Sequence, residues 1–146
     1  MSVIVSFYKL PAKYKKVAVE AIFWVILIRL LIWIFSFDFV KKKIQKIASH
    51  YTPTTKHTVS MSRLRLLIMS TARYIPRATC LVQALAGYIL FSKYGYTTSI
   101  KIGVLNENGE FEAHAWLENG NSVVLGESEK YFITIMDISG NKDSKY

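Results

Sequence analysis

Two residues of this chain could together carry nucleophilic chemistry. Cys80 is the only cysteine, and His114 stands later in the chain within the motif Ala-His-Ala-Trp. A thiolate is a strong nucleophile, and a neutral imidazole can take the proton that the thiol loses. A lone cysteine with a histidine on another element is therefore a candidate thiol dyad. A single cysteine also excludes an internal disulfide and a cysteine-rich metal site, and it is typical of a reducing compartment.

The residues around Cys80 predict that it begins a helix. Thr79 can serve as the N-cap, apolar residues recur at helical spacing as far as Lys93, and Gly95 supplies a stop. The first turn of a helix presents unpaired N–H groups and the positive end of the helix dipole, and both favour an anion. A helix over Cys80–Lys93 would therefore make the thiol a better nucleophile.

His114 is predicted to lie on a strand, because beyond Gly95 the apolar residues recur with a period of two. The alternation places His114 on the same face as Glu112 and Trp116. Asn-Glu-Asn-Gly at residues 106–109 is a strong hairpin signal. Helices followed by an antiparallel meander make this an α+β domain. The expected strands are Thr97–Leu105, Glu110–Leu117, Ser122–Leu125 and Tyr131–Asp137.

The N-terminal part of the chain is predicted to be helical. The apolar run Ala18–Phe37 is broken only by Glu20, Arg29 and Ser36, and it is almost long enough to span a bilayer. Arg29 near its centre would cost roughly 3 kcal/mol in a membrane, which favours a packed helix over a span. We expect a helix from Ala12 to about Ala48, with Phe39–Ala48 as its basic end or as a second short helix, and another from a cap at Ser60 or Ser62 to about Tyr74.

The length of the chain limits the number of domains, and its net charge limits the kinds of partner that it can bind. The 146 residues are most simply one domain: a helical region 1–60, a core 61–137 and a flexible tail 138–146. The net charge of +9 is uneven, since residues 1–60 carry ten basic residues against two acidic ones. An acidic protein partner, a membrane surface or a nucleic acid would each suit such a basic region.

These motifs together resemble a known family, the B2 proteins of lasso-peptide biosynthesis. The points of resemblance are a Pro-x-x-x-Cys-Leu-x-x-Ala-Leu helix, a Tyr-Gly-Tyr turn before an Ile-x-x-Gly-Val strand, and Ala-His-Ala-Trp. Glu20-Ala21-x-x-Trp24 and Arg29 also fit the helical lead-in of that family. The resemblance covers most of the chain and is densest from Leu64 to Gly126.

The resemblance implies a transglutaminase-like, papain-like cysteine protease core with a catalytic triad. Cys80 corresponds to the nucleophile and His114 to the general base. The family usually has an aspartate on the next strand. Here a glutamate stands in its place, because Glu127 follows Val-Val-Leu-Gly at residues 123–126. We expect Glu127 to be the third member, with Glu118 and Asp137 as weaker candidates. The oxyanion would be received by the backbone N–H of Cys80 and a second donor.

By the same resemblance, the protein is a cytoplasmic leader peptidase that cuts a lasso precursor between leader and core, without metal or cofactor. The implied partners are the precursor peptide, a separate leader-recognition protein (B1) and the lasso cyclase, with no nucleic acid and with membrane association not favoured. The basic, aromatic N-terminal half is then a candidate docking surface. Two alternatives stay open: an acyl transferase of the transglutaminase fold, and a non-catalytic protein that binds a membrane or a nucleic acid.

Overall fold

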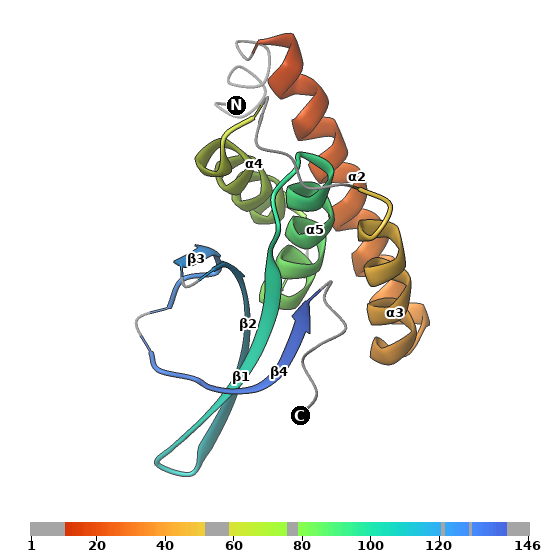
Figure 1. The fold of residues 1–146 in the computed structure, drawn as a ribbon. Coiled ribbons are helices and arrows are strands. Elements are labelled where there is room, and N and C mark those ends of the chain that lie inside the picture. The colour runs from red at the N-terminus through yellow and green to blue at the C-terminus, as the bar shows by residue number, and fades with distance from the viewer. Residues whose placement is uncertain (1–10, 52–58, 76–78, 121, 129, 140–146) are drawn as a thin grey trace.

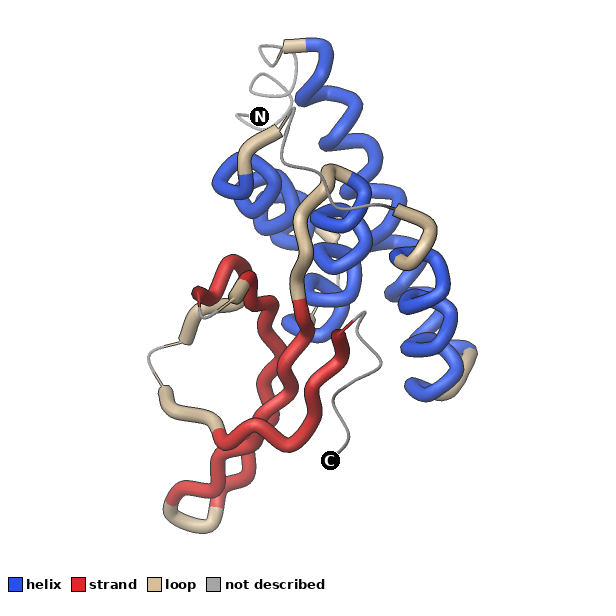
Figure 2. Tube along the Cα trace, in the orientation of Figure 1, coloured by secondary structure: helices blue, strands red, loops and turns tan. Residues whose placement is uncertain are grey.

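Helices and strands occupy separate layers of the molecule (Figures 1 and 2). The computed structural model describes residues 11–51, 59–75, 79–120, 122–128 and 130–139. Within them, four helices precede a four-stranded antiparallel sheet. The predicted α+β class is therefore confirmed.

The apolar N-terminal segment forms two helices, α2 (Ala12–Ile34) and α3 (Phe37–Ala48). Phe35 is extended, with φ −111° and ψ 163°, so the chain turns there. The hydroxyl of Ser36 then accepts a hydrogen bond from the backbone N–H of Phe39 and caps α3. A second short helix is thus the correct one of the two expected alternatives, although it begins two residues earlier than expected.

The next two helices begin at the caps that the sequence predicts. Ser60 caps α4 (Met61–Tyr74), and Thr79 caps α5 (Cys80–Lys93) through a 3.4 Å hydrogen bond from Val82 N. α5 ends in a Schellman motif, because Gly95 has φ 91° and Tyr96 N donates to Phe91 O at 2.8 Å. Both ends of the helix that begins at Cys80 are therefore fixed by local hydrogen bonds.

The sheet has the strand order β3-β2-β1-β4. β4 pairs with β1 instead of following β3, so the expected meander is wrong for the last strand. Alternation along a strand reports which face is buried, whereas it carries no information about which neighbour a strand will choose. The strands are β1 (Ser99–Glu107), β2 (Glu110–Asn119), β3 (Ser122–Leu125) and β4 (Ile133–Ser139).

The C-terminal limit of the sheet differs slightly from the expected one. Ile138 belongs to β4, pairs with Ile100 and is 2% exposed, so it is part of the core and not of a tail. The remainder of the expected tail, residues 140–146, lies outside the described residues.

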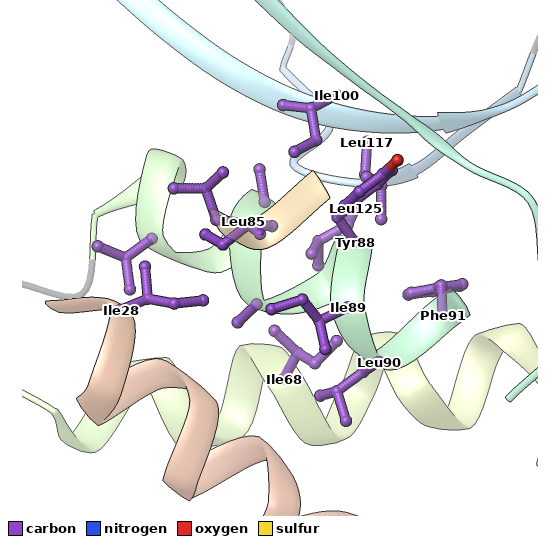
Figure 3. Packing of buried hydrophobic residues seen from close by; sticks show 14 of the residues in the cluster. Ile28, Ile68, Leu85, Tyr88, Ile89, Leu90, Phe91, Ile100, Leu117 and Leu125 are labelled. Atoms are coloured by element: carbon purple, nitrogen blue, oxygen red, sulfur yellow. The ribbon is translucent and has the colours of Figure 1, made fainter. Parts of the chain in front are cut away.

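α5 is the centre of the core, with the other helices and the sheet packed around it (Figure 3). Leu117 and Leu125 reach from the sheet toward Gly87, where an added Cβ would lie only 2.7 Å from Leu125 Cδ2. A side chain at Gly87 would therefore force Leu125 to shift within the packed core. The close approach buries α5 almost all round: its fully or nearly fully buried residues are Val82, Ala84, Leu85, Ala86, Gly87, Tyr88, Ile89, Leu90 and Phe91.

Candidate functional site

Cys80 is the first residue of α5 and is partly buried with a free thiol. The Thr79 cap fixes the entry of the chain into the helix, and Gln83 N donates to Thr79 O at 3.0 Å. The thiol therefore sits at the helix end whose N–H groups and dipole favour a thiolate and an oxyanion. This is the position that the sequence predicts for it.

His114 lies in β2, opposite Gly103 of β1. Its ring packs against Trp116, with ring centroids 5.9 Å apart, and against Phe132, at 5.1 Å. Its Nε2 lies 2.7 Å from the carbonyl oxygen of Gly126. A carbonyl only accepts, so Nε2 must carry the proton and donate, which leaves the lone pair of Nδ1 to act as a base.

Gly126 can offer this carbonyl because it has no side chain. Its φ is 84°, in the left-handed region, and an added Cβ would lie 3.0 Å from Ala115 O and 3.2 Å from Trp116 Cα. The chain after β3 thus passes close against the backbone beside His114. This contact was not predictable from the sequence, because a backbone acceptor leaves no signal in the residue types beyond the glycine itself.

Each of the three candidate carboxylates has another partner. Glu127 Oε2 lies 3.6 Å from Arg65 Nη2 of α4, in a partly exposed ion pair. Glu118 accepts a 2.9 Å hydrogen bond from the indole of Trp116, and Asp137 pairs with Lys101. Within the described residues, none of them hydrogen-bonds His114.

A pocket of about 290 Å³ opens on the His114 side of the sheet. His114, Glu118 and Glu127 line it together, so two of the candidate carboxylates share the cavity with the imidazole. Aromatic side chains form much of the remaining wall. The full lining consists of His114, Trp116, Glu118, Val123, Gly126, Glu127, Ser128, Lys130, Tyr131, Phe132 and Thr134.

The thiol and the imidazole are not in contact. Over the described part of the chain, no hydrogen bond joins Cys80 to His114, and Cys80 does not line the pocket. The alternation of β2 explains why: Ala115 and Leu117 are buried, and Leu117 reaches α5 at Gly87, so His114 on the other face of the strand points away from α5. The structure brings His114 and Glu127 to one cavity and leaves Cys80 apart from them.

No cluster of three potential metal ligands (His, Cys, Asp or Glu) occurs among the residues that the structure describes. The chemistry available at the pocket is that of an imidazole base whose Nδ1 has no hydrogen-bond partner among the described residues, with carboxylates nearby and an aromatic wall. With the thiol at the start of α5, these groups have the composition needed for acyl transfer through a thioester.

Residues 24–137 match the family model described as the transglutaminase-like superfamily. The match spans more than half of the chain and includes Cys80, His114 and all three candidate carboxylates. No curated protein and no solved structure matches the chain.

Proposed function

The chain belongs to the transglutaminase-like superfamily, and we propose that it is the leader peptidase of a lasso-peptide pathway. The observation that carries the proposal is the family match over both the helix that begins at Cys80 and the strand that holds His114. Superfamily membership supports thiol-dependent protease or acyl-transfer chemistry. The motif resemblance around Cys80 and His114 supports the narrower choice of a lasso precursor as substrate.

In the proposed reaction, Nδ1 of His114 takes the proton of Cys80, and the thiolate attacks the carbonyl at the leader–core junction. The backbone N–H of Cys80 donates to the oxyanion. The imidazolium then protonates the departing amine of the core as the C–N bond breaks. Water, deprotonated by His114, hydrolyses the thioester and releases the leader.

This chemistry requires Cys80 Sγ and His114 Nδ1 to meet when substrate is bound. In the free protein His114 faces away from the helix that Cys80 begins, so the proposal includes a rearrangement of β2 or of the start of α5 when substrate binds. Glu127, in the same cavity as His114, is the proposed third residue, and its charge would stabilise the imidazolium. The carbonyl of Gly126 would hold the ring in position meanwhile.

The proposed setting is cytoplasmic, with the precursor presented by a separate leader-recognition protein (B1) and the product passed to the lasso cyclase. No cofactor is required for peptide hydrolysis through a thioester. An acyl transferase of the same superfamily would share Cys80 and His114 but would pass the acyl group to an amine.

The test is cleavage of a lasso precursor peptide, with and without a leader-recognition protein, followed by mass spectrometry. We expect Cys80→Ala and His114→Ala each to abolish cleavage while circular dichroism stays unchanged. Glu127→Gln should lose roughly 10- to 100-fold in kcat, since the Gly126 carbonyl still orients the ring. Glu118→Gln, whose carboxylate already binds Trp116, is the matched control and should do little.

Two results would overturn the assignment. Substantial cleavage by folded Cys80→Ala protein would exclude a thiol protease. Preferential transfer of the leader acyl group to an added amine, in place of hydrolysis, would instead identify an acyl transferase.

A further inference from the structure

The outer face of α2 carries a continuous apolar stripe. Seven large side chains on this helix are between 41% and 72% exposed. At about 100° per residue, they all fall within an arc of roughly 120° on the helix surface. We call them the outer stripe: Val19, Ile22, Phe23, Ile26, Leu30, Trp33 and Ile34.

The opposite face of α2 is fixed to the body of the protein. Val17, Val25 and Ile28 are at most 1% exposed in the core. Glu20 ties the helix to the end of α5, because Lys93 Nζ lies 2.8 Å from its carboxylate and the hydroxyl of Tyr94 donates to it at 3.1 Å. Among the described residues, α2 is the one helix that is long and apolar enough to cross a membrane. If it did so, its buried face would lose its contacts with the core.

Basic side chains flank the stripe at both ends. Lys16 is exposed at its N-terminal end. At the other end Phe35 stacks on Phe39 of α3, with ring centroids 4.7 Å apart, which extends the apolar surface onto α3. The exposed face of α3 then continues as Lys42, Lys43 and Lys46. Residues 1–60 as a whole carry a net charge of +8.

We propose that the outer stripe and the lysines of α3 bind an anionic lipid surface, with α2 lying in the interface and not across the bilayer. The exposed apolar side chains would enter the acyl boundary, the flanking lysines would meet the anionic headgroups, and the inner apolar face of α2 stays buried in the protein core. A protein partner is less well matched, since docking surfaces between proteins are only about 56–58% apolar and carry about ten hydrogen bonds. The seven stripe residues carry one hydrogen-bonding group, the indole N–H of Trp33, and the half-exposed Arg29 borders the stripe. None of its residues lines the His114 pocket, so the proposal stands apart from the cleavage chemistry.

The test is co-sedimentation of the full chain with vesicles of phosphatidylcholine alone or with about 30% phosphatidylglycerol. Binding should need the anionic lipid. Phe23→Ser/Trp33→Ser should weaken it at least about tenfold, because two large apolar side chains no longer enter the acyl boundary. The matched control is Phe111→Ser/Ile135→Ser, which removes two equally exposed apolar side chains from the sheet and should bind as the wild type does.

The lysines are tested separately. Replacing Lys42, Lys43 and Lys46 by Gln should reduce vesicle binding on the order of 100-fold at low salt, because each lost charge weakens binding about fivefold. The difference in binding between this variant and the wild type should shrink as the salt concentration rises. Unchanged circular dichroism and Tm would show that each variant is folded.

Four results would overturn the proposal. Equal loss in the stripe and sheet variants, or no binding to either vesicle, would remove the stripe as a lipid contact. Binding that resists alkaline carbonate would show a spanning helix instead. Self-association in the absence of lipid that Phe23→Ser/Trp33→Ser abolishes in sedimentation velocity would show that a second copy covers the stripe.

Discussion

At the scale of residues, the imidazole of His114 is held by a main-chain carbonyl and aromatic packing. A 2.7 Å hydrogen bond to Gly126 O fixes the proton on Nε2, and Trp116 and Phe132 pack against the ring. A backbone acceptor is neutral, so it selects the tautomer without adding negative charge to stabilise an imidazolium. In the proposed mechanism the two tasks that one carboxylate performs in a triad would therefore be divided, with the Gly126 carbonyl orienting the ring and Glu127 supplying the charge.

Gly126→Ala tests this orienting role. The added Cβ would displace the chain from Ala115 O, move the carbonyl and release Nε2. We expect a loss of at least tenfold in kcat and, by ¹⁵N NMR of the ring, mixed His114 tautomers in place of a dominant Nε2–H form.

The control is Gly109→Ala, whose φ of 81° nearly equals that of Gly126, while an added Cβ there meets nothing within 4 Å. Both substitutions should cost about 1 kcal/mol of stability through the left-handed backbone. If both variants kept the Nε2–H tautomer and full activity, the Gly126 carbonyl would have no orienting role.

At the scale of elements, the helix limits were predictable and the pairing of the strands was only partly so. Thr79, Ser60 and Gly95 fix helix ends through bonds to residues a few positions away, so a short window of sequence contains the signal. The pairing of β4 with β1 depends on residues distant in the chain. The meander prediction failed for that reason, although the facing of β2 was predicted correctly.

The candidate site shows the same contrast between features set by local sequence and features set by contacts between distant residues. Cys80 at the start of α5 and His114 on β2 could be placed from local pattern. Their separation, the Gly126 carbonyl and the Arg65–Glu127 ion pair all depend on how elements pack, which alternation and capping do not encode. A glycine directly before the predicted third residue was the one available hint.

The junction of α2 with α5 gives a pH-dependent prediction. Burial, and then the nearby carboxylate of Glu20, raises the pKa of Tyr94 to about 12 from an ordinary 10.0. The unfolded phenol ionises first as the pH rises, so the stability that this junction contributes is present below pH 10 and is lost between about pH 10 and 12.

The free energy of unfolding of Tyr94→Phe should therefore depend less on pH between pH 10 and 12. Measured by urea unfolding, the free energy of unfolding of the wild type should fall more steeply between pH 10 and 12 than that of Tyr94→Phe. The comparison of the two proteins cancels the ionisation of the lysines that both share. Parallel curves would show that the Tyr94–Glu20 contact does not couple to ionisation.

At the scale of the whole molecule, the sheet and the helical layer carry different kinds of surface. The sheet carries the His114 pocket, while the basic excess and the outer stripe lie on α2 and α3, in the helical layer (Figure 1). α5 joins them, since it packs against α2, α3 and β2 and begins with Cys80. A protein held at a membrane by its helical layer would leave the pocket of the sheet open to a peptide.

The central claim, that Cys80 forms a thioester with the leader, is tested most directly by trapping that intermediate. Turnover of the precursor is quenched with acid, and the enzyme is analysed by intact-protein mass spectrometry and peptide mapping. We predict a mass increase equal to the leader less one water, located on Cys80 and absent from Cys80→Ala and His114→Ala. Cleavage that continues undiminished in Cys80→Ala, with the leader attached to another residue or to none, would contradict the claim.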